Sequence, residues 1–340
     1  MKLGKIESIL LIGGARLLAE FAERLKQDKL QVVVVSSPRH LGEAVRRDGA
    51  ILESVLARLS VPVLSAEDIN REPRVDRYIT DSTLGIAIGA AWVFEKPFVS
   101  KFKGRLLDFM GIRLPQFRGG AHYTWQILMK NRTGSCNLQV IEGGAESLHK
   151  GPVIKSHQYF FPPNCRIPRD YFDAAVPQEA QFLMEFLCDV QQEKSFEPIP
   201  LQEQFNSYYP FLSTQKQGFI NWSWNTQEIE SFICAFDEPY MGASTFLRGR
   251  RVFLKDAHAE YVDGLFHPFQ VGLVYRVCNG AIYVVTREGS IVVRRMTDEK
   301  SQNVLASVTV GMRLFTPQSV LEEAMQYDAV YGASGLQGGI

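Results

Sequence analysis

The sequence has no excess of charge of either sign. Its 37 lysines and arginines balance 37 aspartates and glutamates, so the formal net charge of the 340 residues is zero. Proteins that bind nucleic acids or anionic membranes usually carry clustered positive charge. The short basic run Arg248–Arg251 is offset by nearby acids and is typical of a solvated face. We therefore expect neither a nucleic acid nor a membrane surface as a partner.

Cysteine is scarce and scattered. The five cysteines form no CxxC pair and no Cys/His cluster with zinc spacing: Cys136, Cys165, Cys188, Cys234 and Cys278. This pattern gives no disulfide framework and no metal site, and it is typical of reduced thiols in a cytoplasmic protein.

Long apolar runs are absent as well. No stretch approaches the roughly 18–20 apolar residues that a membrane-spanning helix needs. The apolar run near the N-terminus is broken by Gly13 and Gly14, so it indicates a first strand and not a signal peptide. We therefore predict a protein without a membrane span.

The first part of the chain alternates apolar runs with helical patterns. The runs at 8–14, 30–37 and 84–94 are apolar on consecutive residues, as strands buried on both faces of a parallel sheet are. This alternation predicts a Rossmann-like, doubly wound α/β domain. Ligands of such sheets bind beyond the carboxyl ends of the strands, so the loops after Ile88 and Leu107 are the expected place for a site.

From Phe253 onwards the pattern changes to short alternating strands with turn signals, which predicts a small antiparallel β-barrel of OB-like type. Between the two parts, Asn225 and Glu228 predict a helix start, with Trp222 and Trp224 packing that helix against a domain. The predicted division is 1–200 for the α/β domain, 201–230 for a linker and hinge, 231–318 for the β-barrel, and 319–340 for a C-terminal helix and flexible tail.

The stretch from Arg105 to Trp125 has the form of a catalytic loop. Its frame consists of Leu114, Pro115, Arg118, Gly119 and Gly120. Such a frame is suited to holding a reacting group in place. The positions just before it, however, include Met110, whose thioether cannot act as an acid or a base.

Four motifs occur in a fixed order along the chain: this loop, "IEGGAESLHKGPVI", "YYPFLST" followed by "GFINWSW", and "AFDEPYMGA". Together they resemble the folate-dependent formyltransferase family, over roughly residues 80 to 316. That family includes methionyl-tRNA formyltransferase and the sugar N-formyltransferases. The resemblance implies a Rossmann-like domain that binds 10-formyltetrahydrofolate, followed in the longer members by a small β-barrel.

The resemblance places the catalytic positions on this chain. The family pattern is an Asn, one residue, a His, then Leu-Pro-x-x-Arg-Gly, and later an Asp before a Gly. Here the Asn position is Asp108 and the His position is Met110. The Asp position is His149 if the following glycine is Gly151, and Glu146 if the loop has no insertion; both assignments stay open.

The resemblance also implies which parts contact the cofactor. Relatives place the backbone of the strand and loop "GIAIGAAWVF" against the pteridine, and a glycine-rich loop follows later in the chain. The expected cofactor-binding residues are Gly89, Ala90, Ala91, Trp92, Gly143 and Gly144. The cofactor implied is 10-formyltetrahydrofolate, and no metal is expected.

The replaced residues bear directly on activity. Loss of one donor to a developing oxyanion typically costs about 10²–10³ in rate. Met110 offers no donor, and an ionised Asp108 would place negative charge beside negative charge. Formyl transfer by the family's usual arrangement is therefore not expected at a normal rate, and whether the chain is an active enzyme stays open.

Three hypotheses remain. The first is a degenerate formyltransferase, a pseudoenzyme that binds folate or a protein partner but transfers poorly. The second is an enzyme in which Asp108 and His149 form an exchanged acid–base pair; a separation above about 8 Å would exclude it. The third is an ordinary active enzyme. A purely structural adaptor would have its pocket filled by Met110 and Ile112.

The expected acceptor is a small-molecule amine, with an amino sugar nucleotide favoured over charged tRNA because the second domain is neutral. The sequence does not fix the oligomeric state and allows a homodimer.

Overall fold

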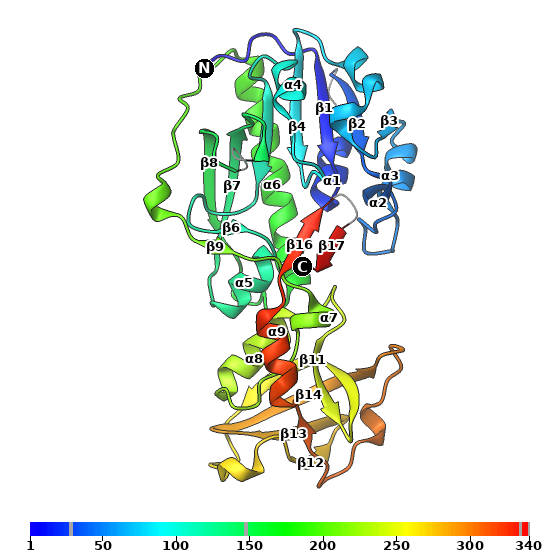
Figure 1. Ribbon diagram of the computed structural model, residues 1–340, viewed down its shortest axis with the longest axis vertical. Coiled ribbons are helices and arrows are strands. Elements are labelled where there is room, and N and C mark those ends of the chain that lie inside the picture. The colour runs from blue at the N-terminus through cyan, green and yellow to red at the C-terminus, as the bar shows by residue number, and fades with distance from the viewer. Residues whose placement is uncertain (27–29, 146–148, 333–334, 339–340) are drawn as a thin grey trace.

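The structure, a computed structural model, describes residues 1–26, 30–145, 149–332 and 335–338. An α/β domain forms one half of the molecule and an antiparallel β domain the other (Figure 1). Helices α5 and α8 and a long connecting segment lie between the two halves. The predicted fold class, a Rossmann-like domain followed by a small antiparallel OB-like domain, is confirmed.

The α/β domain is built on a seven-stranded sheet with the order β3-β2-β1-β4-β5-β7-β8. Five neighbouring strands pair in parallel, β7 pairs antiparallel with β5, and β8 pairs antiparallel with β7. The five are β1 (Ser8–Gly13), β2 (Gln31–Ser36), β3 (Val63–Ser65), β4 (Thr83–Ile88) and β5 (Leu106–Met110); the edge strands are β7 (Thr133–Val140) and β8 (Val153–Phe160).

Both faces of the sheet are covered, which explains the continuous apolar runs. In β1, Ile9 and Leu11 face the core under α1, α3 and α6, whereas Leu10 and Ile12 face the core under α4. The helices of this domain are α1 (Arg16–Leu25), α2 (Pro38–Leu41), α3 (Leu52–Arg58), α4 (Lys96–Ser100), α5 (His122–Leu128) and α6 (Pro168–Gln191).

The connecting segment contains the short strand β9 (Tyr208–Tyr209), which pairs with β6 (Arg118–Gly119), and the helices α7 (Thr214–Gln217) and α8 (Thr226–Ala235). As predicted, α8 begins with a capping box in which Asn225 Oδ1 accepts from the Glu228 amide at 2.8 Å. Trp222 is buried and donates from its indole nitrogen to Thr245 at 2.9 Å, which ties the segment just before this helix to the β domain.

The β domain is a six-stranded antiparallel sheet with the order β12-β13-β14-β11-β10-β15. Its strands are β10 (Ala243–Leu247), β11 (Arg250–Glu260), β12 (Val274–Cys278), β13 (Ala281–Thr286), β14 (Gly289–Asp298) and β15 (Leu314–Phe315). Its apolar face packs on α8 and continues into α5 and α6 through Ile127 and Ala175, so the two halves share one core.

The chain ends with α9 (Gln318–Gln326) and a hairpin of β16 (Ala329–Gly332) and β17 (Gly335–Gly338). The hairpin, red in Figure 1, follows α9 and pairs with the connecting segment through a β-bridge between Ala329 and Phe211. Before the hairpin, the Tyr327 carbonyl oxygen accepts a hydrogen bond from the Gln217 side chain at 3.0 Å. The predicted flexibility of the tail stays a prediction. Within the described residues, no helix is long and apolar enough to cross a membrane.

Candidate active site

A cavity of about 830 Å³ opens at the carboxyl ends of β4 and β5. Its walls come from the loop after β4, the end of β5, the loop before α5, the loop after β7 and one face of α6. This is where a doubly wound sheet places its ligands. The loop after Ile88 lines the cavity as the sequence predicted, and so does the end of β5 that follows Leu107.

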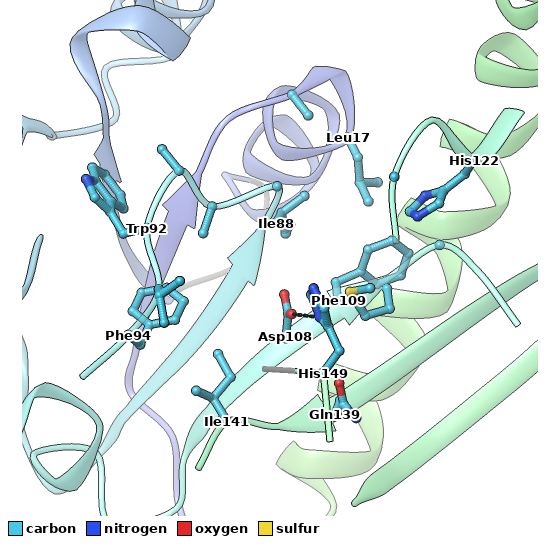
Figure 2. A pocket seen from close by; sticks show the side chains of 18 of the residues that line it. Leu17, Ile88, Trp92, Phe94, Asp108, Phe109, His122, Gln139, Ile141 and His149 are labelled. Carbon is cyan, nitrogen blue, oxygen red and sulfur yellow. Dashed lines mark ion pairs between the residues drawn. The ribbon is translucent and has the colours of Figure 1, made fainter. Parts of the chain in front are cut away.

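The cavity has two ends, with one carboxyl and one imidazole side chain between them. Trp92 and Phe94 stand at one end, Leu17 and His122 stand at the other, and Asp108 and His149 lie between (Figure 2). The expected cofactor-contacting residues all line this cavity: Gly89, Ala90, Ala91, Trp92, Gly143 and Gly144.

At two positions of this wall, the backbone conformation and the close neighbours require glycine. Gly89 has φ +59°, and a Cβ there would lie 2.9 Å from the carbonyl oxygen of Gly14. Gly143 has φ +81°, and a Cβ there would lie 3.0 Å from Lys96. Both positions therefore present bare main chain to the cavity. Trp92 is fixed by its indole, which donates to the carbonyl oxygen of Glu67 at 2.7 Å.

Asp108 and His149 come together although 41 positions separate them, as the residue numbers show. Asp108 is held in β5 between β4 and β7, and His149 stands just before β8 with φ +56°. His149 Nδ1 is 3.6 Å from Asp108 Oδ2, and the side chains are 27% and 19% exposed. That separation is slightly longer than a hydrogen bond, and Nδ1 is buried with no hydrogen-bond partner among the described residues.

Met110 does not close the cavity. Its side chain is 8% exposed and forms part of the wall, whereas Ile112 is buried away from the cavity. The backbone after β5 is pinned from beneath by the Asn137 amide, which donates to the carbonyl oxygens of Met110 and Ile112. The expectation for a structural adaptor, a pocket filled by these two residues, is therefore wrong.

The loop frame is held by the connecting segment. Arg118 is buried to 8% exposure and donates through both terminal nitrogens to Glu203, at 2.7 Å each. A Cβ on Gly119 would lie 1.7 Å from Tyr209 O, and one on Gly120 would lie 2.1 Å from the Phe211 ring. Gly119 and Gly120 line the cavity, whereas Leu114, Pro115 and Arg118 lie outside it and shape the loop.

His122 belongs to this frame. Its Nε2 is 2.9 Å from the carbonyl oxygen of Gly119, and burial lowers the pKa of the imidazole to about 4. At neutral pH the ring is uncharged, so it donates its proton to Gly119 and secures the turn into α5.

Glu179 is a cavity residue that sequence reasoning missed. It lies on α6, is 5% exposed, and accepts a hydrogen bond from the Tyr123 hydroxyl at 3.4 Å. Burial raises the pKa of its carboxyl to about 7, which the Tyr123 hydrogen bond opposes. The helical spacing of the sequence could have indicated that Glu179 is buried. Glu179 falls on the same helical face as Ala175 and Leu183, both of which are fully buried.

Glu146, the other candidate for the family Asp position, lies outside the described residues. Within the described part of the chain, no group of three or more His, Cys, Asp or Glu residues is arranged to hold a metal ion.

Comparison with known proteins supports the resemblance. Residues 213–310 match the family model described as "Formyl transferase, C-terminal domain". A search of curated proteins finds no match.

Solved structures share the fold over most of the chain. A variant of HypX from Aquifex aeolicus has a TM-score of 0.60 and 17% identity, over 88% of this chain and 46% of HypX. An N-formyltransferase from Helicobacter canadensis, solved with folinic acid and dTDP-3-aminofucose, has a TM-score of 0.59 and 15% identity, over 88% of this chain and 99% of that one. This chain thus spans about half the length of HypX.

At these identities the solved structures show a common fold and no more, and the family model covers the C-terminal domain alone, residues 213–310. The ordered motifs between roughly residues 80 and 316 and the match of the C-terminal domain thus agree with the resemblance to the formyltransferase family.

Proposed function

We propose that this chain binds a reduced folate in the cavity and transfers a formyl group to a small primary amine, with Asp108 and His149 as an exchanged acid–base pair. One observation carries the proposal: the two side chains lie 3.6 Å apart on the wall of an open cavity. The resemblance alone assigns these two residues to catalytic positions of the family. Their closeness in space is a separate observation, because it comes from the structure.

The cavity residues fit a folate. Its volume of about 830 Å³ lies within the usual range for small-molecule sites, about 300–1,000 Å³. Trp92, Phe94 and Ile141 offer flat apolar surface at one end, as a planar heterocycle requires. The main chain at Gly89 and Gly143, which carries no side chain, offers hydrogen bonds to the edge of such a ring system.

A bound 10-formyltetrahydrofolate would supply the formyl group, so the protein has to position the acceptor, donate hydrogen bonds and move protons. With Nδ1 directed at Asp108, His149 has Nε2 left to meet a ligand. Imidazole exchanges protons near neutral pH, and a neighbouring carboxylate orients the ring and stabilises its charged form. In this arrangement His149 carries protons and Asp108 orients it.

A second function is a folate-binding protein that transfers formyl poorly. Met110 favours it, because this wall residue offers no hydrogen-bond donor at the position where relatives have histidine. Loss of one hydrogen-bond donor to the developing oxyanion lowers the reaction rate by about 10²–10³-fold.

For the acceptor we propose an amino sugar nucleotide. Arg16 lines the cavity and also an adjoining groove that contains Arg46, Arg47 and Arg58. Guanidinium groups bind phosphates through paired hydrogen bonds, as a nucleotide diphosphate would need. Much of this charge is compensated within the protein, because Arg16 and Arg47 both form ion pairs with Asp173 and Arg46 forms ion pairs with Glu20 and Glu23.

The first experiment is calorimetric titration with 5-formyltetrahydrofolate, a stable analogue of the donor. We expect micromolar binding; absence of binding up to millimolar ligand would remove both functions. Formyl transfer from 10-formyltetrahydrofolate is then measured with amino sugar nucleotides, including dTDP-3-aminofucose.

Variants distinguish the two functions. If the exchanged pair is catalytic, His149→Ala lowers kcat by about 100-fold or more while folate binding persists. The exposed His157→Ala serves as the matched control. If the wild type binds folate but does not transfer formyl, and Asp108→Asn, Met110→His, His149→Asp together restore transfer, the second function is correct.

A further inference from the structure

Glu179 is a buried carboxyl on the cavity wall that lacks a cation. Tyr123 is its hydrogen-bond donor, and no lysine, arginine or histidine of the described chain forms an ion pair with it. A buried carboxylate is unfavourable unless a positive charge or several donors compensate it. The protein therefore places a carboxyl where a cationic ligand group would be stabilised.

The position of the carboxyl depends on Gly111. A Cβ on Gly111 would lie 2.7 Å from Glu179 Oε1, so any larger residue there would displace the carboxyl. Gly111 follows Asp108 by three residues, which corresponds to about 10 Å along an extended chain. A small molecule in the cavity can thus reach Glu179 and the Asp108–His149 pair together.

Glu179 lies away from the end of the cavity that suits a folate. Its partner Tyr123 follows His122, which stands opposite Trp92 and Phe94 in the cavity (Figure 2). The walls on this side are aromatic and apolar, formed by Tyr123, Phe172, Val176 and Tyr240. They suit the body of an acceptor that carries its amine on a ring.

We propose that Glu179 binds the ammonium group of the acceptor and takes one of its protons. This inference rests on the proposed function, and it assigns the acceptor class as a primary amine carried on a ring. Such an amine arrives protonated at neutral pH, and it becomes a nucleophile when a proton is removed. Removing that proton is the task for which an otherwise unpaired carboxyl is placed at this end.

The proton balance is complete without another reactant. One proton passes from the ammonium to Glu179 and then to water. The amine nitrogen then gains its bond to the formyl carbon as the bond from that carbon to the folate nitrogen breaks. His149 carries the second amine proton to the folate nitrogen, and no electron is gained or lost.

The surroundings of Glu179 keep its titration separate from that of its neighbours. Tyr123 on α5, Cys136 on β7 and Tyr159 on β8 face it, and burial raises the pKa of each of these groups. They stay neutral through the neutral range, while burial brings the pKa of Glu179 to about 7. A carboxyl that titrates near the working pH can both take up and release a proton.

The test compares the whole chain with Glu179→Gln, Glu179→Asp and Glu185→Gln, the last an exposed glutamate on the same helix. We expect all four proteins to bind 5-formyltetrahydrofolate within about threefold of each other. In transfer from 10-formyltetrahydrofolate to dTDP-3-aminofucose, Glu179→Gln should lower kcat by about 100-fold or more and remove the rise of rate with pH near neutrality. Glu179→Asp should restore part of the rate.

A second measurement does not depend on finding the natural acceptor. In protein labelled with ¹³C at glutamate carboxyls, the signal missing from Glu179→Gln is followed through a pH titration, with and without saturating cyclohexylammonium chloride. An ammonium beside the carboxyl should lower its midpoint by about one unit or more.

The outcomes separate the two proposals. Absence of folate binding in the wild type removes the proposed function and this inference with it. Folate binding with either full transfer by Glu179→Gln or an unchanged Glu179 midpoint overturns the inference alone.

Discussion

Replacing Glu179 by glutamine should change how the stability of the protein depends on pH. Burial raises the pKa of this carboxyl from 4.5 to about 7 in the folded chain. Well below pH 4.5 the carboxyl is neutral in both the folded and the unfolded chain, so its burial does not change the free energy of unfolding with pH. As pH rises towards 7, the unfolded chain ionises first, so the folded state loses stability relative to a neutral glutamine. The difference of about 2.5 units corresponds to about 3 kcal/mol, and it is complete above pH 7.

Urea unfolding measures this directly. The free energy of unfolding is determined for wild type and Glu179→Gln by tryptophan fluorescence from about pH 4.5 to about pH 8. The difference between the two proteins should shift by about 3 kcal/mol in favour of the variant over that range, since other titrating groups cancel in the comparison. Glu185→Gln, on the exposed face of the same helix, should show no comparable shift.

A change smaller than about 1 kcal/mol would refute the reasoning, because it would mean that the Glu179 carboxyl remains solvated in the folded protein. The same reasoning fails if Glu179→Gln and Glu185→Gln behave alike.

Three further predictions concern the loop frame, the cap of α8 and the binding of folate. Gly119→Ala should lower the free energy of unfolding by more than about 2 kcal/mol, because its Cβ would meet Tyr209 O at 1.7 Å; Gly249→Ala, which has open space, should lose less in the same urea titration. Asn225→Ala should lower it by about 1 kcal/mol by removing the cap of α8, and an unchanged urea midpoint would contradict the cap's role. Saturation with 5-formyltetrahydrofolate at a hundredfold of its Kd should raise the free energy of unfolding by about 2.7 kcal/mol, and no rise would contradict folate binding.

Much of the fold could be predicted because its local signals agree with its tertiary structure. Strands β1 and β2 read as buried on both faces because Ile9 and Leu10, which are adjacent in sequence, face two different cores. The start of α8 was predictable because a capping box involves residues only three positions apart, Asn225 and Glu228.

The site was predictable only in part. Motif order indicated Asp108 and His149 as replaced catalytic positions, but their separation of 3.6 Å depends on how β5 and the loop before β8 meet in space. Glu179 was missed because its meaning depends on contact with Gly111, 68 positions earlier in the numbering. The bridge between Phe211 and Ala329 near the C-terminus also joins residues far apart in the sequence, and a glycine-rich end gives no local sign of such a contact.

The way the loop frame is held separates the shape of this site from its chemistry. Gly119 and Gly120 are fixed by close contact with Tyr209 and Phe211, and Arg118 is fixed by Glu203. None of these contacts involves the side chains at positions 108, 110 or 149, so the reacting groups can be exchanged without moving the loop that presents them. Such a chain can change its catalytic residues one at a time while the fold and cavity persist. The cavity at the carboxyl ends of β4 and β5 is therefore a natural starting point for engineering new transfer reactions.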